Sequence, residues 1–300
     1  MTWTSERLRA LVEHDDPVEV IWEALWDIWE SPDGPDEQYA SQREWETVEL
    51  ERTLLDTYWE FYSEVLPWRC VNEASISVPD EGAFLVMDAM SVREAGLFAE
   101  ILDDQGYEVS VGYSYATVPS ETTDYKNRIG YAALEREHPS ETVRSRSPSL
   151  SGDERLVWCK YPDSLLENIQ EGKTEISTFE EAYADTEDVF CSTLEQLDAD
   201  RVVVGSDHGY IRAESGFNFA IGEQAKNRLK ETFGGSRFVR VDETEGDGDG
   251  LVSNHLAVEA DGYYLPVGRY TWPVRGKYST VQHGGLSLIE CLTPRLEVQR

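Results

Sequence analysis

Hydrophobic residues in the first part of the chain recur every three or four positions, which is the spacing of one buried face of an α-helix. The pattern covers residues 3–66 and is interrupted at residues 32–35 by a turn-forming sequence with two prolines and a glycine. A second helical stripe begins near Trp45 and continues to Tyr62. We therefore expect residues 1–78 to form a helical accessory region.

From Gly82 onward, short apolar runs alternate with amphipathic segments. The first run, at 83–88, is followed by a helix-like segment at 91–106 and by a second strand-like run at 107–116. This alternation is typical of βαβ units, which build a parallel sheet with functional residues at the carboxyl ends of its strands. We expect residues 79–300 to form one α/β domain around a doubly wound, mostly parallel sheet. Further strand-like runs occupy residues 155–161, 201–207, 237–243 and 256–270, the last as a hairpin through Asp261-Gly262.

Two capping-box patterns, in which a Ser or Thr precedes a Glu by three positions, indicate where helices begin. One is Ser91 with Glu94, and the other is Ser177 with Glu180. Within the first pattern, Arg93 is expected to pair with Glu94 or to be solvated.

Composition changes this picture mainly through charge. The chain carries 59 acidic and 26 basic residues, a formal charge of −33. A charge this large is spread over the surface and predicts a halophilic protein, because dissolved salt screens the self-repulsion. It also disfavours nucleic-acid binding through broad electrostatics, since that mode of binding needs clustered Lys and Arg.

The sequence contains no run of 18 apolar residues, and its N-terminus lacks the basic and apolar segments of a secretory signal. Its four cysteines are widely spaced without a CxxC pair, so neither a zinc ribbon nor a disulfide framework is indicated. We expect a cytoplasmic protein with reduced thiols and no membrane partner.

Candidate chemistry lies where apolar strands end. Asp88 ends the most apolar run in the chain, immediately before the first capping box. The run at 201–207 ends in Asp207, which is followed by His208 and Gly209. An adjacent carboxylate and imidazole at a strand end suit a borderline metal such as zinc. A simple strand-end Asp and an ordinary Asp-His turn are the alternatives.

A third segment, residues 283–290, reads HGGLSLIE and places His283 on a glycine-rich turn before a short helix capped by Ser287. Alone, this histidine would more often be a surface residue than a ligand. Its weight comes from its combination with the two acidic strand ends.

Together these segments resemble the alkaline phosphatase superfamily, and SDHGY with HGGLS resembles its PglZ-domain branch. The resemblance covers about residues 80–300. It implies an alkaline phosphatase-like fold and a metal-dependent phosphoesterase, in which two metal ions, usually zinc, flank a Ser or Thr nucleophile.

The resemblance also implies a ligand set. Asp88, Asp207 and His208 match the ligands of one metal, and His283 matches a ligand of the other. That second metal normally takes an Asp and a His four residues later, which here are Asp163 and a departure from the pattern at Glu167. A glutamate there shifts preference toward Mn²⁺ or Mg²⁺, and a weak or empty second site is a further alternative. Both residues also fit the acidic first turn of a helix.

The expected nucleophile follows a strand and precedes a helix. Residues 119–122, PSET, resemble the P-S-x-T loop of PglZ domains, which makes Thr122 the candidate nucleophile. Thr117 is the runner-up, because its Thr-x-Pro order resembles the nucleophile loop of nucleotide pyrophosphatases in the same superfamily. Either residue also fits an N-cap.

The leading hypothesis is a phosphoesterase acting on a phosphodiester or phosphomonoester, with in-line attack by a threonine alkoxide. Family association alone suggests an antiviral defence system with protein partners. The departure at Glu167 motivates an alternative, a catalytically weak binding or regulatory module with one metal site. A sulfatase is disfavoured because the chain has no C-x-P-x-R segment.

Overall fold

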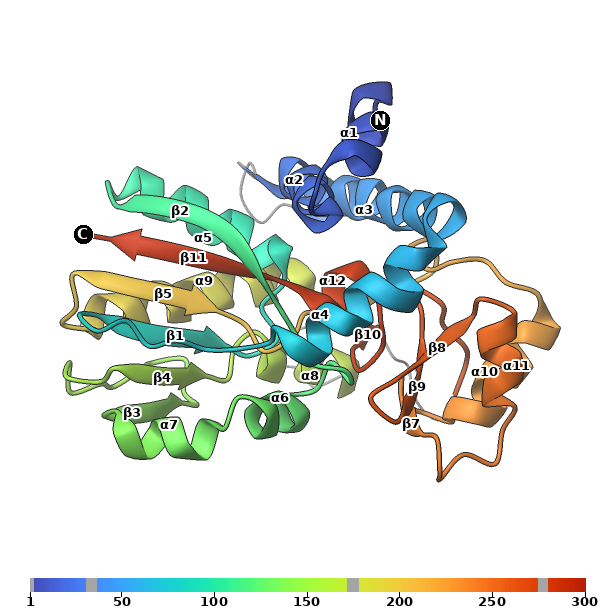
Figure 1. Cartoon of the computed structure of the whole chain (residues 1–300). Coiled ribbons are helices and arrows are strands. Elements are labelled where there is room, and N and C mark those ends of the chain that lie inside the picture. Colours follow the sequence, from blue (N-terminus) through green and yellow to red (C-terminus); the bar gives the residue numbers. More distant parts are fainter. Residues whose placement is uncertain (1–2, 31–36, 172–177, 275–279) are drawn as a thin grey trace.

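A six-stranded sheet forms the centre of the computed structural model, which describes residues 3–30, 37–171, 178–274 and 280–300 (Figure 1). Its strands follow the order β2-β11-β5-β1-β4-β3. They are β1 (Ala83–Met87), β2 (Glu108–Tyr115), β3 (Ser140–Val143), β4 (Leu156–Cys159), β5 (Arg201–Gly205) and β11 (Leu292–Gln299).

The sheet is mostly parallel, as expected, with one antiparallel strand. Strand β1 pairs in parallel with both β4 and β5, and Leu85 is the partner of Val157 on one side and of Val204 on the other. Strand β11 runs antiparallel between β2 and β5. The strand pattern did not predict β11, because Pro294 and two charged residues interrupt its apolar alternation.

Helices cover both faces of the sheet, which confirms the predicted α/β architecture (Figure 1). Leu85 belongs to the larger core, where Phe98 and Phe190 stack with ring centroids 3.9 Å apart. Phe84 points to the opposite face and packs with Tyr125. The helices involved are α5 (Val92–Asp104), α8 (Asp163–Glu171) and α9 (Phe179–Gln196) on the first face, and α6 (Thr122–Arg128) and α7 (Tyr131–Glu137) on the second.

The described residues before the sheet are helical, as the first hydrophobic pattern predicts. Helix α2 begins at Pro17, and Asp16 caps it by accepting a hydrogen bond from the Val18 amide. The predicted turn at 32–35 lies outside the described residues, and the division of the chain at residue 78 stays a prediction. The elements are α1 (Ser5–Glu13), α2 (Pro17–Trp29), α3 (Glu37–Thr57), a π-helical turn η1 (Phe61–Val65) and α4 (Leu66–Asn72).

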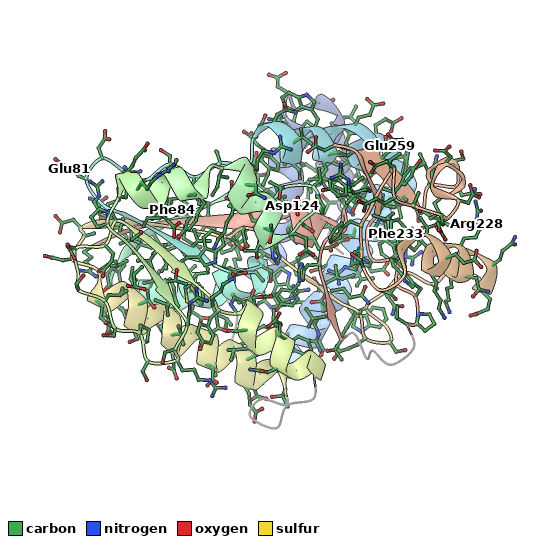
Figure 2. All side chains as sticks on the ribbon, turned by 90° about the horizontal axis from the view of Figure 1, so that it is seen from below. Glu81, Phe84, Asp124, Arg228, Phe233 and Glu259 are labelled. Atoms are coloured by element: carbon green, nitrogen blue, oxygen red, sulfur yellow. The ribbon has the colours of Figure 1, made fainter. Side chains whose placement is uncertain are left out.

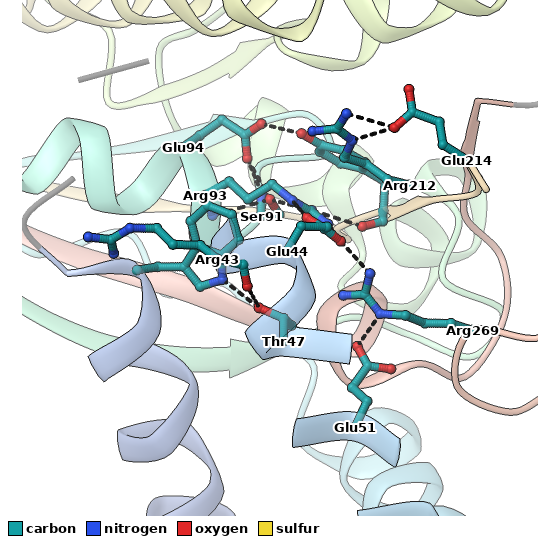
Figure 3. Close-up of polar contacts among 12 residues, drawn as sticks. Arg43, Glu44, Thr47, Glu51, Ser91, Arg93, Glu94, Arg212, Glu214 and Arg269 are labelled. Atoms are coloured by element: carbon teal, nitrogen blue, oxygen red, sulfur yellow. Dashed lines mark hydrogen bonds and ion pairs between the residues drawn. The ribbon is translucent and has the colours of Figure 1, made fainter. Parts of the chain in front are cut away.

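A fully buried ionic network joins α3 to the rest of the fold (Figure 3). The Arg93 guanidinium donates two hydrogen bonds of 2.8 Å to the Glu44 carboxylate. Arg269 also contacts Glu44 and lies 3.2 Å from Glu51. The expectation that Arg93 pairs with Glu94 or is solvated is therefore wrong. Local spacing could not reveal a partner 49 residues away.

A smaller lobe follows β5 and lies beyond the carboxyl ends of the parallel strands (Figure 1). The predicted hairpin is confirmed, because β8 and β9 pair antiparallel across Asp261 and Gly262. The strand predicted over 237–243 is reduced to two residues. The lobe contains α10 (Glu223–Phe233), α11 (Gly248–Ser253) and the sheet β7-β9-β8, with β7 (Val239–Arg240), β8 (Ala257–Ala260) and β9 (Tyr263–Pro266).

Helix starts follow the capping patterns with one shift. The capping box of Ser91 and Glu94 is present as expected. Helix α9 is capped by Thr178 with Glu181, one position after the predicted pair, whose Ser177 lies outside the described residues. Short helix α12 (Leu288–Cys291) is capped by Ser287, as expected.

Two further expectations can be compared with the structure. All four cysteines are free thiols. Across the described ranges, none of the helices combines the length and the apolar character needed to span a membrane.

Candidate metal and nucleophile site

Two adjacent strand ends bring the first acidic residues together. Strands β1 and β5 are parallel neighbours, so Asp88 and Asp207 leave the sheet at the same edge. The backbone amide of Ala89 donates a 3.0 Å hydrogen bond to Asp207 Oδ1, which ties the two ends to each other. Both carboxylates are completely buried. Figure 2 shows the whole molecule from below, with the label of Asp124 (α6) between those of Phe84 in the sheet and Phe233 in the smaller lobe.

Asp88, Asp207 and His208 form a compact group of metal-ligand type. One ligand atom from each lies within 4.8 Å of the others, and this is the one such group among the described residues. Asp207 Oδ2 is buried without a hydrogen-bond partner. His208 Nδ1 lies 3.0 Å from the Gly209 carbonyl oxygen, to which it can donate, so Nε2 is left with a lone pair. Two carboxylates, an imidazole and an orphaned oxygen fit a divalent cation.

The pKa values of the two aspartates reflect burial and the closeness of their carboxylates. Burial, followed by the charge of Asp88, raises the pKa of Asp207 above its usual range. Burial alone would also raise the pKa of Asp88, but His208 and Lys160 outweigh it and hold that pKa below its usual value. A bound cation would relieve the repulsion between the two carboxylates.

Thr122 lies directly against this group. Its hydroxyl donates a 3.1 Å hydrogen bond to Asp88 Oδ1 and is 3.3 Å from His208 Nε2. The N-cap of α6 is Glu121, whose side chain makes no capping hydrogen bond, so Thr122 is the first residue of the helix rather than its cap. The runner-up, Thr117, is buried and donates to the carbonyl oxygen of Pro119 within its own turn. The geometry therefore favours Thr122, and its catalytic role stays a prediction.

His283 lies beside the same group. Its ring stacks on that of His208, with centroids 4.4 Å apart. His283 Nδ1 is 3.1 Å from Glu121 Oε1 and 3.3 Å from the Ser120 carbonyl oxygen. Burial alone would lower the pKa of His283, but the hydrogen bond and charge of Glu121 raise it to about 10. Glu121 thus orients the ring in the way that outer carboxylates orient metal-bound histidines.

Asp163 approaches from the start of α8. Its backbone amide donates a 3.1 Å hydrogen bond to the Asp88 carbonyl oxygen. Burial and the nearby charge of Asp88 raise the pKa of Asp163 to about 7. Glu167, one helical turn later, is exposed. These two residues, His283 and Glu121 line a cavity of about 370 Å³, whose other walls include Phe238, Trp272 and Val281.

The structure thus brings the predicted residues together to different degrees. Asp88, Asp207, His208 and Thr122 are in direct contact. Asp163, Glu167 and His283 share one cavity. They do not form a second compact ligand group within the part of the chain that the structure describes. A second metal at these three residues stays a prediction.

Sequence reasoning missed two direct partners of Asp88. Trp158 Nε1 donates a 2.8 Å hydrogen bond to Asp88 Oδ2, and the Lys160 ammonium group contacts the same oxygen. Trp158 is buried in the core and also contacts the site. Pairing the runs at 83–88 and 155–161 as neighbouring strands would have revealed Lys160, because Met87 and Cys159 are partners in the register.

Two positions near the site leave no room for a Cβ atom and are occupied by glycine. The Gly209 amide donates to the Glu290 carbonyl oxygen at 2.9 Å. A Cβ atom on Gly209 would lie 2.1 Å from the carbonyl oxygen of Ile289. A Cβ on Gly285 would lie 2.6 Å from Arg237, which forms a buried ion pair with Glu290. Gly209 therefore allows the backbone at Ile289 to pack closely, and Gly285 leaves room for the Arg237 side chain.

Comparison with known proteins adds little to this geometry. No model of a known protein family matches the chain, and no curated protein matches it. Among solved structures, phosphonoacetate hydrolase from Sinorhizobium meliloti 1021 in complex with phosphonoacetate is similar at 12% identity and a TM-score of 0.24. The match covers 72% of this chain and 65% of that chain. A similarity at this level carries no functional argument.

Proposed function

We propose that the protein is a metal-dependent phosphoesterase with Thr122 as its nucleophile. The observation that carries the proposal is the position of the Thr122 hydroxyl, 3.1 Å from Asp88 Oδ1 and 3.3 Å from His208 Nε2. A threonine hydroxyl is a weak nucleophile at its ordinary pKa and needs activation by a base or a metal. Here it lies at the edge of a buried donor group that fits a metal.

Asp88, Asp207 and His208 would hold the metal ion. When bound, the metal would lower the pKa of the Thr122 hydroxyl and withdraw charge from the phosphoryl oxygens. Asp88 orients the hydroxyl through the hydrogen bond that it accepts from Thr122. The Thr122 oxygen would attack phosphorus in line with the leaving group, and water would then hydrolyse the phosphothreonine. Two successive displacements would retain configuration at phosphorus.

Asp163 and His283, with Glu167, are proposed to hold a second metal next to the first. Their shared cavity supports this role. The two oxygen ligands would favour Mn²⁺ or Mg²⁺ over Zn²⁺ at this position. Glu121 would set the orientation of the His283 ring, and Nε2 would lose its proton when the metal binds, since the pKa of this histidine is raised to about 10.

One observation favours the alternative of a binding or regulatory module with a single metal. Glu167 is exposed, and the described residues include one compact ligand group rather than two. Such a module would bind one metal per chain and would turn over no phosphoester.

Turnover and metal content together separate the two functions. Elemental analysis of the protein purified in high salt would be combined with hydrolysis of p-nitrophenyl phosphate and bis-p-nitrophenyl phosphate. The phosphoesterase proposal expects turnover that Thr122→Ala reduces by at least about 10³-fold, a typical loss for an activated nucleophile. Thr123→Ala is the matched control, since Thr123 is the exposed neighbour on the same helix. One metal per chain without turnover after addition of Zn²⁺ or Mn²⁺ would favour the binding module.

A further inference from the structure

The two oxygens of Asp88 serve two different groups. Oδ1 accepts the hydrogen bond from the Thr122 hydroxyl, whereas Oδ2 contacts Trp158 Nε1 and the Lys160 ammonium group. The carboxylate therefore places a lysine beside the threonine. The Lys160 side chain keeps 27% of its surface exposed, so part of this lysine faces solvent.

A second lysine reaches the same place from α6. Lys126 follows Thr122 by four positions, which puts both side chains on one face of the helix. Its Nζ lies 3.8 Å from the centroid of the Trp158 ring, and Lys160 Nζ lies 5.9 Å from that centroid. Trp158 and Lys160 are two positions apart at the end of β4, so both point to the same side of the sheet. Two lysines thus flank one indole beside Thr122.

Two neighbouring lysines are notable in a chain that is so strongly acidic. The chain has only six lysines and a net charge of −33, yet two of those lysines lie here. Asp88 already pairs with Lys160, and the repulsion between two neighbouring ammonium groups favours a further anion beside them. Within the described ranges, Lys126 has no carboxylate at ion-pairing distance, and its contacts are with the Tyr131 and Trp158 rings. Its positive charge is available to a ligand.

We propose that Lys126 and Lys160 form an anion subsite that binds the terminal oxygens of a phosphomonoester dianion at Thr122. Lysine ammonium groups bind phosphate as point charges, and each added hydrogen bond to a charged oxygen strengthens binding. A monoester carries one more negative charge than a diester, and none of its terminal oxygens is blocked by a second alcohol. The inference rests on the proposed function and narrows its substrate class to monoesters.

Binding of two small anions tests the subsite without any need for turnover. Isothermal titration calorimetry would compare orthophosphate with dimethyl phosphate at pH 8, using the full chain as purified and again after dialysis against Zn²⁺. We expect the wild type to bind orthophosphate at least about tenfold more tightly. Lys126→Met and Lys160→Met should each weaken orthophosphate binding by roughly tenfold, with little change for dimethyl phosphate.

Control variants distinguish the loss of the anion subsite from a general folding defect. Lys226→Met is the matched control, because Lys226 lies on α10 and pairs with Glu223 at 3.0 Å. Lys160→Met leaves the buried Asp88 with one cation fewer, so Lys160→Arg tests the same position with the charge retained and should keep most orthophosphate binding. Circular dichroism would establish that each variant is folded.

The outcomes separate the subsite from the phosphoesterase proposal. Selective loss of orthophosphate binding in Lys126→Met supports the subsite, even if no ester is hydrolysed. Hydrolysis of both esters, with a monoester-to-diester ratio that Lys126→Met leaves unchanged, contradicts it. Failure of orthophosphate to bind in either metal state overturns the subsite as well.

Discussion

The Thr122 hydroxyl and the Asp88 carboxylate, 34 positions apart in the chain, are joined by a 3.1 Å hydrogen bond. This contact joins the start of α6 to the end of β1, where the buried ligand group lies. The contact places the threonine that the sequence analysis already suggests as nucleophile against this ligand group.

Removal of the Asp207 charge should have opposite effects with and without metal. Burial and then the repulsion from Asp88 raise the pKa of Asp207 in the metal-free protein. Asp207→Asn should therefore raise the metal-free stability by roughly 1 kcal/mol. It should also abolish the stabilisation that Zn²⁺ gives the wild type. Thermal denaturation with EDTA and with Zn²⁺ measures both effects, and an equal zinc-induced shift in both proteins would exclude Asp207 as a ligand.

The buried network around Glu44 should make stability depend on acid pH. Burial alone would raise the pKa of Glu44, but Arg93 and Arg269 outweigh it and hold this pKa far below the usual range. A depressed folded-state pKa stabilises the protein above the unfolded-state pKa of about 4.3 and loses that contribution as pH falls toward the folded-state pKa. Unfolding free energy should therefore decrease below about pH 4.

Substitution of Glu44 tests whether this residue causes the loss of stability at acid pH. Glu44→Gln should cost about 3–5 kcal/mol at pH 7, because buried Arg93 loses its carboxylate partner and buried Arg269 loses one of two. The variant should also lose part of the acid dependence between pH 4 and 2. Glu49→Gln, an exposed position on the same helix, is the matched control. If the unfolding free energies of the wild type and Glu44→Gln had the same pH dependence, Glu44 would not be the source of the acid sensitivity.

Close packing between the two glycine-containing segments predicts a position-specific cost. Gly209→Ala should destabilise the protein by about 2 kcal/mol or more, because its Cβ would lie 2.1 Å from the Ile289 carbonyl oxygen. Gly222→Ala is the control, since a Cβ there meets no atom within 4 Å and its φ is −68°. Urea denaturation compares the two variants. A Gly209→Ala protein as stable as Gly222→Ala would mean that the segments are less tightly packed than described.

The second metal site is tested by placing at residue 167 the histidine that the resemblance in the sequence would predict there. Glu167→His should raise zinc content toward two ions per chain, because an imidazole favours zinc more than a carboxylate does. Asn168→His, the next residue on α8, is the control. Elemental analysis after dialysis against Zn²⁺ provides the measurement. No gain over the control would leave Asp163 and His283 without a role as zinc ligands.

Much of the fold followed from the sequence because its signals are local. Apolar runs ending in Asp88 and Asp207 predicted two strand tips, and parallel pairing of β1 with β5 brings those tips to one edge. Strand β11 was missed because Pro294 and the charged positions mask its alternation. The helix start at Thr178 was displaced by one residue because adjacent Ser and Thr offer two capping patterns.

The ligand residues of the site could be predicted from the sequence, but their packing partners could not. The ligand residues are adjacent to strand ends and carry distinctive chemistry, so they could be predicted one segment at a time. Lys160 contacts Asp88 only through the register of β4 on β1, and Lys126 reaches Trp158 only through packing of α6 on the sheet. Arg93 likewise depends on Glu44 of a distant helix. Partners set by long-range packing have no signature in local spacing.

The central claim, nucleophilic attack by Thr122, is tested most directly by identifying the phosphorylated residue. The protein would be incubated with p-nitrophenyl phosphate and Zn²⁺, quenched in acid and analysed by peptide mass spectrometry. We predict the added mass of one phosphoryl group on Thr122 and its absence in Thr122→Ala. Turnover with the phosphoryl group on another residue, such as Thr117, or with no phosphorylated residue at all, would contradict the mechanism.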